Sequence, residues 1–94
     1  MRGEILDKAK AIINGERQDS YGSPEASFAL IGAYWSAYLK RRLTPVDVAH
    51  MMMLFKIARM SGQKPSEDNY ADLCGYAGIA ADMTKEMEQS APPL

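Results

Sequence analysis

The chain has 94 residues, of which 47% are hydrophobic and 24% are charged, and its formal net charge is −1. This composition is typical of one small folded domain and too apolar for a disordered chain. The 11 Lys and Arg residues do not outnumber the 12 Asp and Glu residues, so the charge balance argues against binding of double-stranded nucleic acid. Because a domain this small buries a modest share of its surface, we expect an oligomer to add burial.

The single cysteine, Cys74, has no second cysteine for an internal disulfide, which fits a reducing compartment. No apolar run reaches the ~18 residues that a membrane span needs. Five charged side chains within residues 1–14 exclude a signal-peptide core there. We therefore expect a soluble cytoplasmic protein that does not contact a membrane.

Helical periodicity dominates the chain, and no stretch alternates as a strand does. The first predicted helix covers residues 3–14, and its apolar face consists of Ile5, Ala9, Ile12 and Ile13. The second covers residues 24–41 and begins after Ser23, which is a suitable N-cap. Its inward stripe consists of Phe28, Ile31, Trp35, Tyr38 and Leu39.

The third predicted helix covers residues 45–60 and opens with a capping box, in which Thr44 caps the helix and Asp47 reaches back to it. The segment VAHMMMLFKIA is apolar on nearly every side. We therefore expect this helix to be the most buried of the four, with the option that two subunits share it.

The fourth predicted helix covers residues 67–88 and follows Ser66 as its N-cap. Two prolines near the end of the chain cannot continue it, so we expect a flexible tail at residues 89–94. The four helices and their short connections predict an all-α four-helix bundle that occupies residues 1–88 as one domain.

Two carboxylates of the fourth helix, Asp68 and Asp72, lie four residues apart and share one ridge with Tyr76. Small residues beside this ridge would let another helix or a ligand come close, and they are Ala71, Cys74, Gly75 and Gly78. Paired carboxylates in a narrow groove suit a magnesium ion. The alternative is structural: Asp68 answers the helix dipole, and Asp72 pairs with a lysine of a neighbouring helix.

Lys56 is the only charged residue between Asp47 and Arg59 in the third helix. It either forms a structural ion pair with Asp72 or supplies positive charge to a phosphate. Arg59 lies one turn further along on a similar side of the helix. We interpret Asp47 as a capping residue on the opposite side.

The loop sequence ERQDSYGSPE brings several polar residues ahead of a helix N-terminus, a place that attracts anions. In the functional interpretation it faces a nucleotide, with Arg17 at a phosphate and Tyr21 at a base or sugar. In the structural interpretation, Tyr21 only packs to hold the loop in place.

Three segments, RQDSYGSPEASF, TPVDVAHMMMLFKIAR and EDNYADLCGYAGIA, together resemble a group of small phage and prophage proteins of undefined function. That group is similar to the nucleotide-modification-associated domains and, more distantly, to the MazG-like all-α NTP pyrophosphohydrolases. The resemblance implies a bundle that forms a homodimer or homotetramer in the cytoplasm of a bacterial host. It also implies a magnesium-dependent site between helices that cleaves a nucleoside triphosphate to monophosphate and pyrophosphate.

If the chain is such an enzyme, the chemistry of its residues suggests their roles. The catalytic residues would be Asp72 and Lys56, the substrate-binding residues Arg17, Tyr21, Lys56, Arg59 and Tyr76, and the magnesium ligands Asp68, Asp72 and Glu25. The chain departs from the pattern of active pyrophosphohydrolases, because its later acids are spaced by four rather than three. It also has no Glu-x-x-Glu pair in an earlier helix, where Glu16, Asp19 and Glu25 are the only nearby acids.

Three hypotheses follow from these residues. The first is an enzyme that hydrolyses a nucleoside triphosphate with magnesium. The second is a protein that binds or sequesters a nucleotide and leaves it intact. The third is a phage accessory protein that acts through protein contacts, in which Lys56 and Asp72 form only a buried ion pair.

Overall fold

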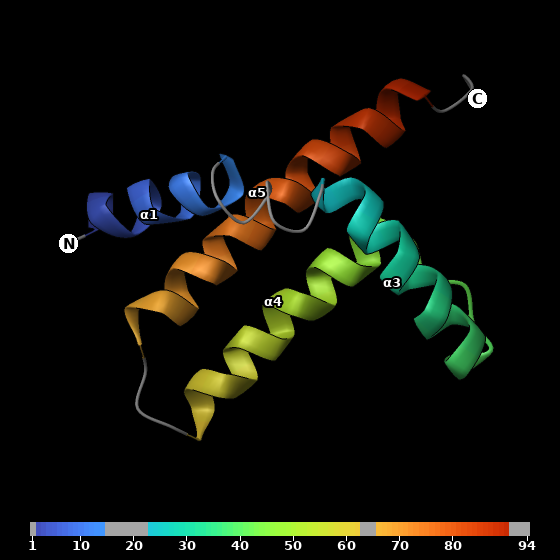
Figure 1. The fold of residues 1–94 in the computed structure, drawn as a ribbon, viewed down its shortest axis with the longest axis horizontal. Coiled ribbons are helices and arrows are strands. Elements are labelled where there is room, and N and C mark those ends of the chain that lie inside the picture. Colours follow the sequence, from blue (N-terminus) through green and yellow to red (C-terminus); the bar gives the residue numbers. More distant parts are fainter. Residues whose placement is uncertain (1, 15–22, 63–65, 91–94) are drawn as a thin grey trace.

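A computed structural model describes residues 2–14, 23–62 and 66–90 of the chain. Within these residues the chain forms four helices and no strand (Figure 1). The helices are α1 (Arg2–Asn14), α3 (Pro24–Leu39), α4 (Pro45–Ser61) and α5 (Glu67–Ser90). The prediction of an all-α protein is confirmed, and all four predicted helices are present.

The longest helix, α5, organises the fold. It lies between α1, which packs along its N-terminal half, and α4, which packs on its other side (Figure 1). The fourth element, α3, packs mainly against α4 and forms the edge of the molecule. The sites described below lie where α1, α4 and α5 come together.

Three N-caps hold the helix starts where the sequence predicts them. The Ser23 hydroxyl accepts a hydrogen bond from the Ala26 amide at 3.2 Å, and the Ser66 hydroxyl accepts one from the Asn69 amide at the same distance. At α4 the full capping box is present: Thr44 Oγ1 accepts from the amide of Asp47 at 3.1 Å, and Asp47 Oδ2 accepts from the Thr44 amide at 2.9 Å. These bonds satisfy amides that a helix N-terminus leaves without partners.

The end of α3 comes two residues earlier than expected. Lys40 adopts a left-handed conformation with φ 56°, and the amide of Arg41 donates to the Ser36 carbonyl at 3.2 Å. The Ser36 hydroxyl also accepts a hydrogen bond from the Leu43 amide at 2.8 Å. This left-handed cap turns the chain toward α4.

Two glycines bring helices close together. A Cβ on Gly75 of α5 would lie 3.1 Å from Ile13 Cγ2 of α1, and a Cβ on Gly32 of α3 would lie 3.3 Å from Val48 Cγ2 of α4. Ala71, on the same side of α5, is fully buried. The prediction that small residues of the fourth helix allow a close helix contact is therefore confirmed.

The core is small. Its buried cluster consists of Phe28, Val48, Ala49, Ala80 and Met83, and half-buried side chains such as Ile31, Trp35, Met52 and Tyr76 pack around it. Val48 is the only large side chain of the described residues that is almost completely enclosed. A core of this size gives limited hydrophobic stabilisation.

One prediction about burial is wrong, and another is met only in part. The third predicted helix, α4, contains Val48 and Ala49, which have no exposed surface, but the same helix exposes Leu54, Phe55 and Ile57. The inward stripe of α3 ends at Trp35, since Tyr38 and Leu39 are exposed. In both cases an apolar pattern around the whole helix shows that burial is favourable, but it does not show which side another helix of the same chain covers.

Candidate functional site

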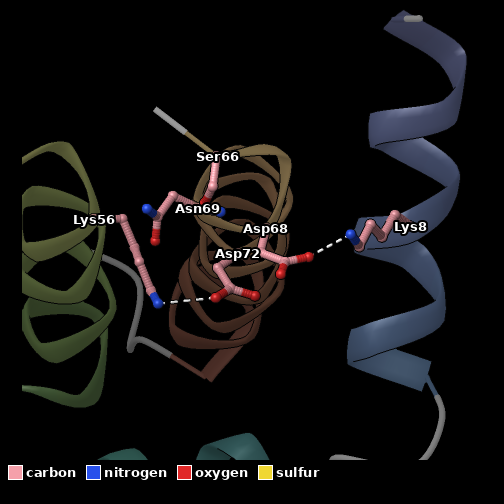
Figure 2. Close-up of polar contacts among 6 residues, drawn as sticks. All are labelled: Lys8, Lys56, Ser66, Asp68, Asn69 and Asp72. Carbon is pink, nitrogen blue, oxygen red and sulfur yellow. Dashed lines mark hydrogen bonds and ion pairs between the residues drawn. The ribbon is translucent and has the colours of Figure 1, made fainter. Parts of the chain in front are cut away.

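A buried ion pair connects α4 and α5. Lys56 Nζ lies 2.8 Å from Asp72 Oδ2, and both residues are only 8% exposed (Figure 2). The structure therefore shows the ion pair with Asp72, one of the two roles that were open for Lys56. Burial removes water from both charges, and the short contact between them offsets part of that cost.

The helix register explains why these two side chains meet. Lys56 lies seven residues after the buried Ala49, which is two turns along the same side of α4. Asp72 directly follows the buried Ala71 in α5. The Phe55 ring lies beside the lysine, with its centroid 5.7 Å from Lys56 Nζ, and adds an attraction between cation and aromatic ring.

A second ion pair lies one turn earlier on α5. Asp68 pairs with Lys8 of α1, so the two carboxylates bind lysines that approach from different neighbouring helices (Figure 2). The hydrogen bond and charge of Lys8 hold the pKa of Asp68 below its ordinary value, and the same hydrogen bond raises the pKa of Lys8. This pair is exposed to solvent, in contrast to Lys56 and Asp72.

One side of the Lys56–Asp72 pair faces an apolar pocket of about 390 Å³. All four described helices line it, with Ile13, Phe28, Ile31, Met52, Tyr76 and Ile79 among the lining residues. The Phe28 and Tyr76 rings lie 5.9 Å apart between centroids and are tilted by 38°. The volume and the apolar walls are in the range of small-molecule sites.

A polar pocket of about 440 Å³ lies on another side of the pair. Its lining residues are Ile12, Lys56, Arg59, Ser66, Asp68, Asn69 and Asp72. Ile12, Lys56 and Asp72 line both pockets, so the two hollows adjoin at the ion pair. A ligand that spans them would meet apolar rings at one end and charged side chains at the other.

The predicted site residues are partly brought together. Four of them line the polar pocket, namely Lys56, Arg59, Asp68 and Asp72, and Tyr76 lines the apolar pocket beside Lys56 and Asp72. Glu25 lies exposed in the first turn of α3 and lines neither pocket. Arg17 and Tyr21 lie outside the described residues, as do Glu16 and Asp19.

The predicted magnesium site at Glu25, Asp68 and Asp72 stays a prediction. Among the residues that the structure describes, no three His, Cys, Asp or Glu side chains are grouped so that they could hold a metal ion. Asp68 and Asp72 supply two carboxylates, and each has a lysine partner. Other ligands would have to come from a substrate or water.

Sequence reasoning did not identify Lys8, Asn69 and Phe28 as site residues. Asn69 lies three residues before Asp72, so its spacing alone places it on the same side of α5. Lys8 and Phe28 depend on how α1 and α3 dock on α5, for which the sequence offers no comparable signal.

The fold and the site define a small all-α protein with an apolar and a polar pocket that meet at a buried ion pair. Residues 4–84 match the model of a domain of unknown function, DUF6378, and the chain belongs to that family. No solved structure matches the chain. None of the helices within the described ranges is long and apolar enough to cross a membrane.

Two relatives are phage proteins. The chain is 37% identical over 92 residues to the Gene 55 protein of Mycobacterium phage D29, which covers 98% of this chain and 61% of that protein. It is 38% identical over 89 residues to the Gene 55 protein of Mycobacterium phage L5, which covers 94% of this chain and 57% of that protein. The chain therefore spans about three fifths of the length of these relatives.

Proposed function

We propose that this protein binds a nucleotide at the Lys56–Asp72 pair. The observation that carries the proposal is that an apolar and a polar pocket share Ile12, Lys56 and Asp72 as walls. A nucleotide has the same division, because its base is flat and largely apolar on its faces and its phosphates are anionic. The base occupies the apolar pocket against Phe28 and Tyr76, and the phosphates occupy the polar pocket.

The charge around the polar pocket supports an anionic ligand. Lys8 pairs with Asp68 and Lys56 pairs with Asp72, so each carboxylate is neutralised. Arg59 lines the same pocket, and neither of these two ion pairs uses its charge. A guanidinium is suited to phosphate because it can donate two parallel hydrogen bonds.

The resemblance to MazG-like proteins supports the same ligand class, since those proteins act on nucleoside triphosphates between helices. A MazG-like fold and a homodimer or homotetramer are parts of this proposal.

Thermal denaturation with a panel of canonical and modified deoxynucleoside triphosphates tests the proposal without magnesium. A ligand that binds only the folded state raises the melting temperature. We expect a nucleoside triphosphate to raise it more than the nucleoside alone or inorganic triphosphate alone, because only the whole molecule fills both pockets. If no nucleotide raises the melting temperature, the accessory-protein hypothesis is favoured instead.

Arg59→Gln distinguishes specific phosphate contact from general charge. Arg59 is exposed, so the substitution should leave the fold intact and weaken nucleotide binding by about tenfold or more, the usual loss for a charge-assisted hydrogen bond. Lys85→Gln is the matched control, because Lys85 is also an exposed cation but lines neither of the two pockets. Equal losses from both variants, measured by calorimetric titration, would contradict the assignment.

Hydrolysis of a nucleoside triphosphate with magnesium is a second candidate. It is favoured by Asp68 and Asp72, which line the same polar pocket. Magnesium commonly takes one or two carboxylates together with substrate phosphates and water, so these two residues fit it only with a nucleotide present. A bound magnesium ion would supply charge stabilisation and an activated water.

The test for this second candidate is the release of pyrophosphate from the same nucleotide panel with magnesium added. Asp68→Asn should abolish release, because it removes an anionic ligand, and it should leave metal-free nucleotide binding in place. Absence of pyrophosphate with every nucleotide that binds would leave binding as the function.

A further inference from the structure

The outward side of α3 is an uncharged surface. Residues 26–39 contain no charged side chain, although this helix forms the edge of the molecule (Figure 1). We define the α3 outer face as Ala26, Leu30, Ala33, Tyr34, Ala37 and Tyr38, all of which are exposed. Leu30, Tyr34 and Tyr38 are 60%, 69% and 86% exposed, which is unusual for large apolar side chains in a helix of a protein that works as a monomer.

The spacing of this face matches a helix-packing seam. Ala26, Leu30, Ala33 and Ala37 follow one another at intervals of four, three and four residues, so they form one stripe along α3. The opposite side of the helix carries Phe28 and Gly32, which pack in the core and against α4. Three alanines in the stripe let a second helix approach closely, and Leu30 and the two tyrosines supply apolar contact area.

Exposed apolar side chains are concentrated on α3. The described residues expose ten large apolar side chains, and four of them belong to this helix. The two most exposed of the ten, Tyr38 and Tyr34, lie on the α3 outer face. A contact that covers this face would therefore remove a large apolar area from water.

The chemistry of the face favours a second copy of the same chain over a different partner. In a two-fold symmetric contact a surface meets its own copy, so a face that carries charges of one sign would repel itself. The α3 outer face has no charge to repel. It also lacks the charged groups that commonly steer and select a different partner.

We propose that the α3 outer face is the interface of a homodimer, in which α3 of one chain packs against α3 of a second copy. This contact leaves both pockets of each chain open, because the lining residues of α3, such as Phe28 and Ile31, lie on its other side. The proposal rests on the homodimer that the proposed function includes and specifies its interface. Dimerisation and nucleotide binding are measured separately, so the failure of one is distinguishable from the failure of the other.

Sedimentation equilibrium of the full chain tests the proposal. The wild-type chain should have twice the 10.4 kDa mass of one chain. Leu30→Lys should weaken association by about a hundredfold or more, because it places a charge opposite its own copy in an apolar contact. Leu6→Lys on α1 is a closely matched control, since Leu6 is 61% exposed against 60% for Leu30, and it should leave the dimer unchanged.

Cross-linking gives a second test that does not depend on a disruptive variant. In a Cys74→Ala background, Ala33→Cys places one thiol in the middle of the stripe, and Asp82→Cys places one on the exposed side of α5. A short bifunctional maleimide should join chains through position 33 much faster than through position 82. A monomeric wild type, equal effects of Leu30→Lys and Leu6→Lys, or equal cross-linking at the two positions would overturn the proposal.

Discussion

At the scale of single residues, the Lys56–Asp72 pair belongs both to the candidate site and to the contact that stabilises the fold. Each side chain is 8% exposed, and each neutralises the other at 2.8 Å. If Asp72 is lost, the Lys56 charge is buried without this counter-charge, and that loss costs more free energy than the intact pair contributes. The pair therefore stabilises the contact between α4 and α5 mainly because breaking it would cost free energy.

A double-mutant cycle measures this coupling. We expect Lys56→Met and Asp72→Leu each to lower the free energy of unfolding by about 3 kcal/mol, because each breaks a buried pair. Lys56→Met combined with Asp72→Leu should lose much less than the sum of the single losses, since no buried charge remains. Urea unfolding of the variants checks this, and additive losses would show that the two side chains act independently.

The exposed Lys8–Asp68 pair should be visible as a dependence of stability on pH. Lys8 lowers the pKa of Asp68 below 3.8, so this carboxylate contributes stability above that pH and loses it as the pH falls through the lowered pKa. The raised pKa of Lys8 works in the opposite direction, and its contribution is lost as the pH rises through that raised value, above 10.5. Between these limits the contribution of the pair should be constant.

Carbon-detected NMR titration of Asp68 gives the direct measurement. In Lys8→Met the pKa of Asp68 should rise back toward 3.8, because the hydrogen bond and the charge are both removed. The variant Lys10→Met removes a nearby exposed cation of the same helix and should leave the titration of Asp68 unchanged. An unchanged pKa in Lys8→Met would mean that the ion pair does not form in solution.

At the scale of helices, local chemistry was sufficient to predict where α3, α4 and α5 begin. Ser23, Thr44 and Ser66 each cap the helix that follows, and such caps require only residues within one turn. The end of α3 was less predictable, because the left-handed Lys40 is held through the contact of Ser36 with Leu43, seven residues apart. Helix starts are therefore encoded locally, whereas this helix end depends on the path to α4.

Docking of α1 on α5 depends on how closely the two backbones approach at Gly75. Gly78→Ala should stabilise the protein by about 0.5–1 kcal/mol, because alanine favours the helix and its Cβ would meet Ile13 only at 3.6 Å. Gly75→Ala should be clearly less stable than Gly78→Ala, since its Cβ would lie 3.1 Å from Ile13 and must displace that side chain. Thermal unfolding of the two variants side by side provides the comparison.

The substitution Ile13→Ala separates crowding from other effects at Gly75. It removes the Cγ2 atom that the new Cβ would meet, so in that background Gly75→Ala and Gly78→Ala should change stability by similar amounts. A deficit of Gly75→Ala that persists without the Ile13 side chain would mean that α1 docking is not its cause.

At the scale of the whole molecule, the sequence indicated the Lys56–Asp72 contact that the two pockets share, but it did not predict the pockets. The lone charge of Lys56 in an apolar helix and the placement of Asp72 beside small residues indicated a contact between α4 and α5 as one of two roles for Lys56. The apolar pocket has walls from all four described helices, and its Phe28 and Ile13 walls depend on tertiary packing. The apolar periodicity likewise indicated that α3 and α4 have apolar surfaces to bury. It did not indicate that parts of these surfaces stay exposed in the single chain.

A homodimer through the α3 outer face would make stability depend on the concentration of the chain. If two chains bury the α3 outer face only when folded, mass action raises the melting temperature as the concentration rises. We expect this dependence in calorimetric scans of the wild type and of Leu6→Lys, and we expect it to vanish in Leu30→Lys. At every concentration, Leu30→Lys should melt at the temperature at which the most dilute wild-type sample melts. Because Leu30 is already 60% exposed in one chain, the substitution should cost the isolated chain little. A melting temperature that is independent of concentration in the wild type would mean that the single chain, with its small core around Val48, is the stable folded unit.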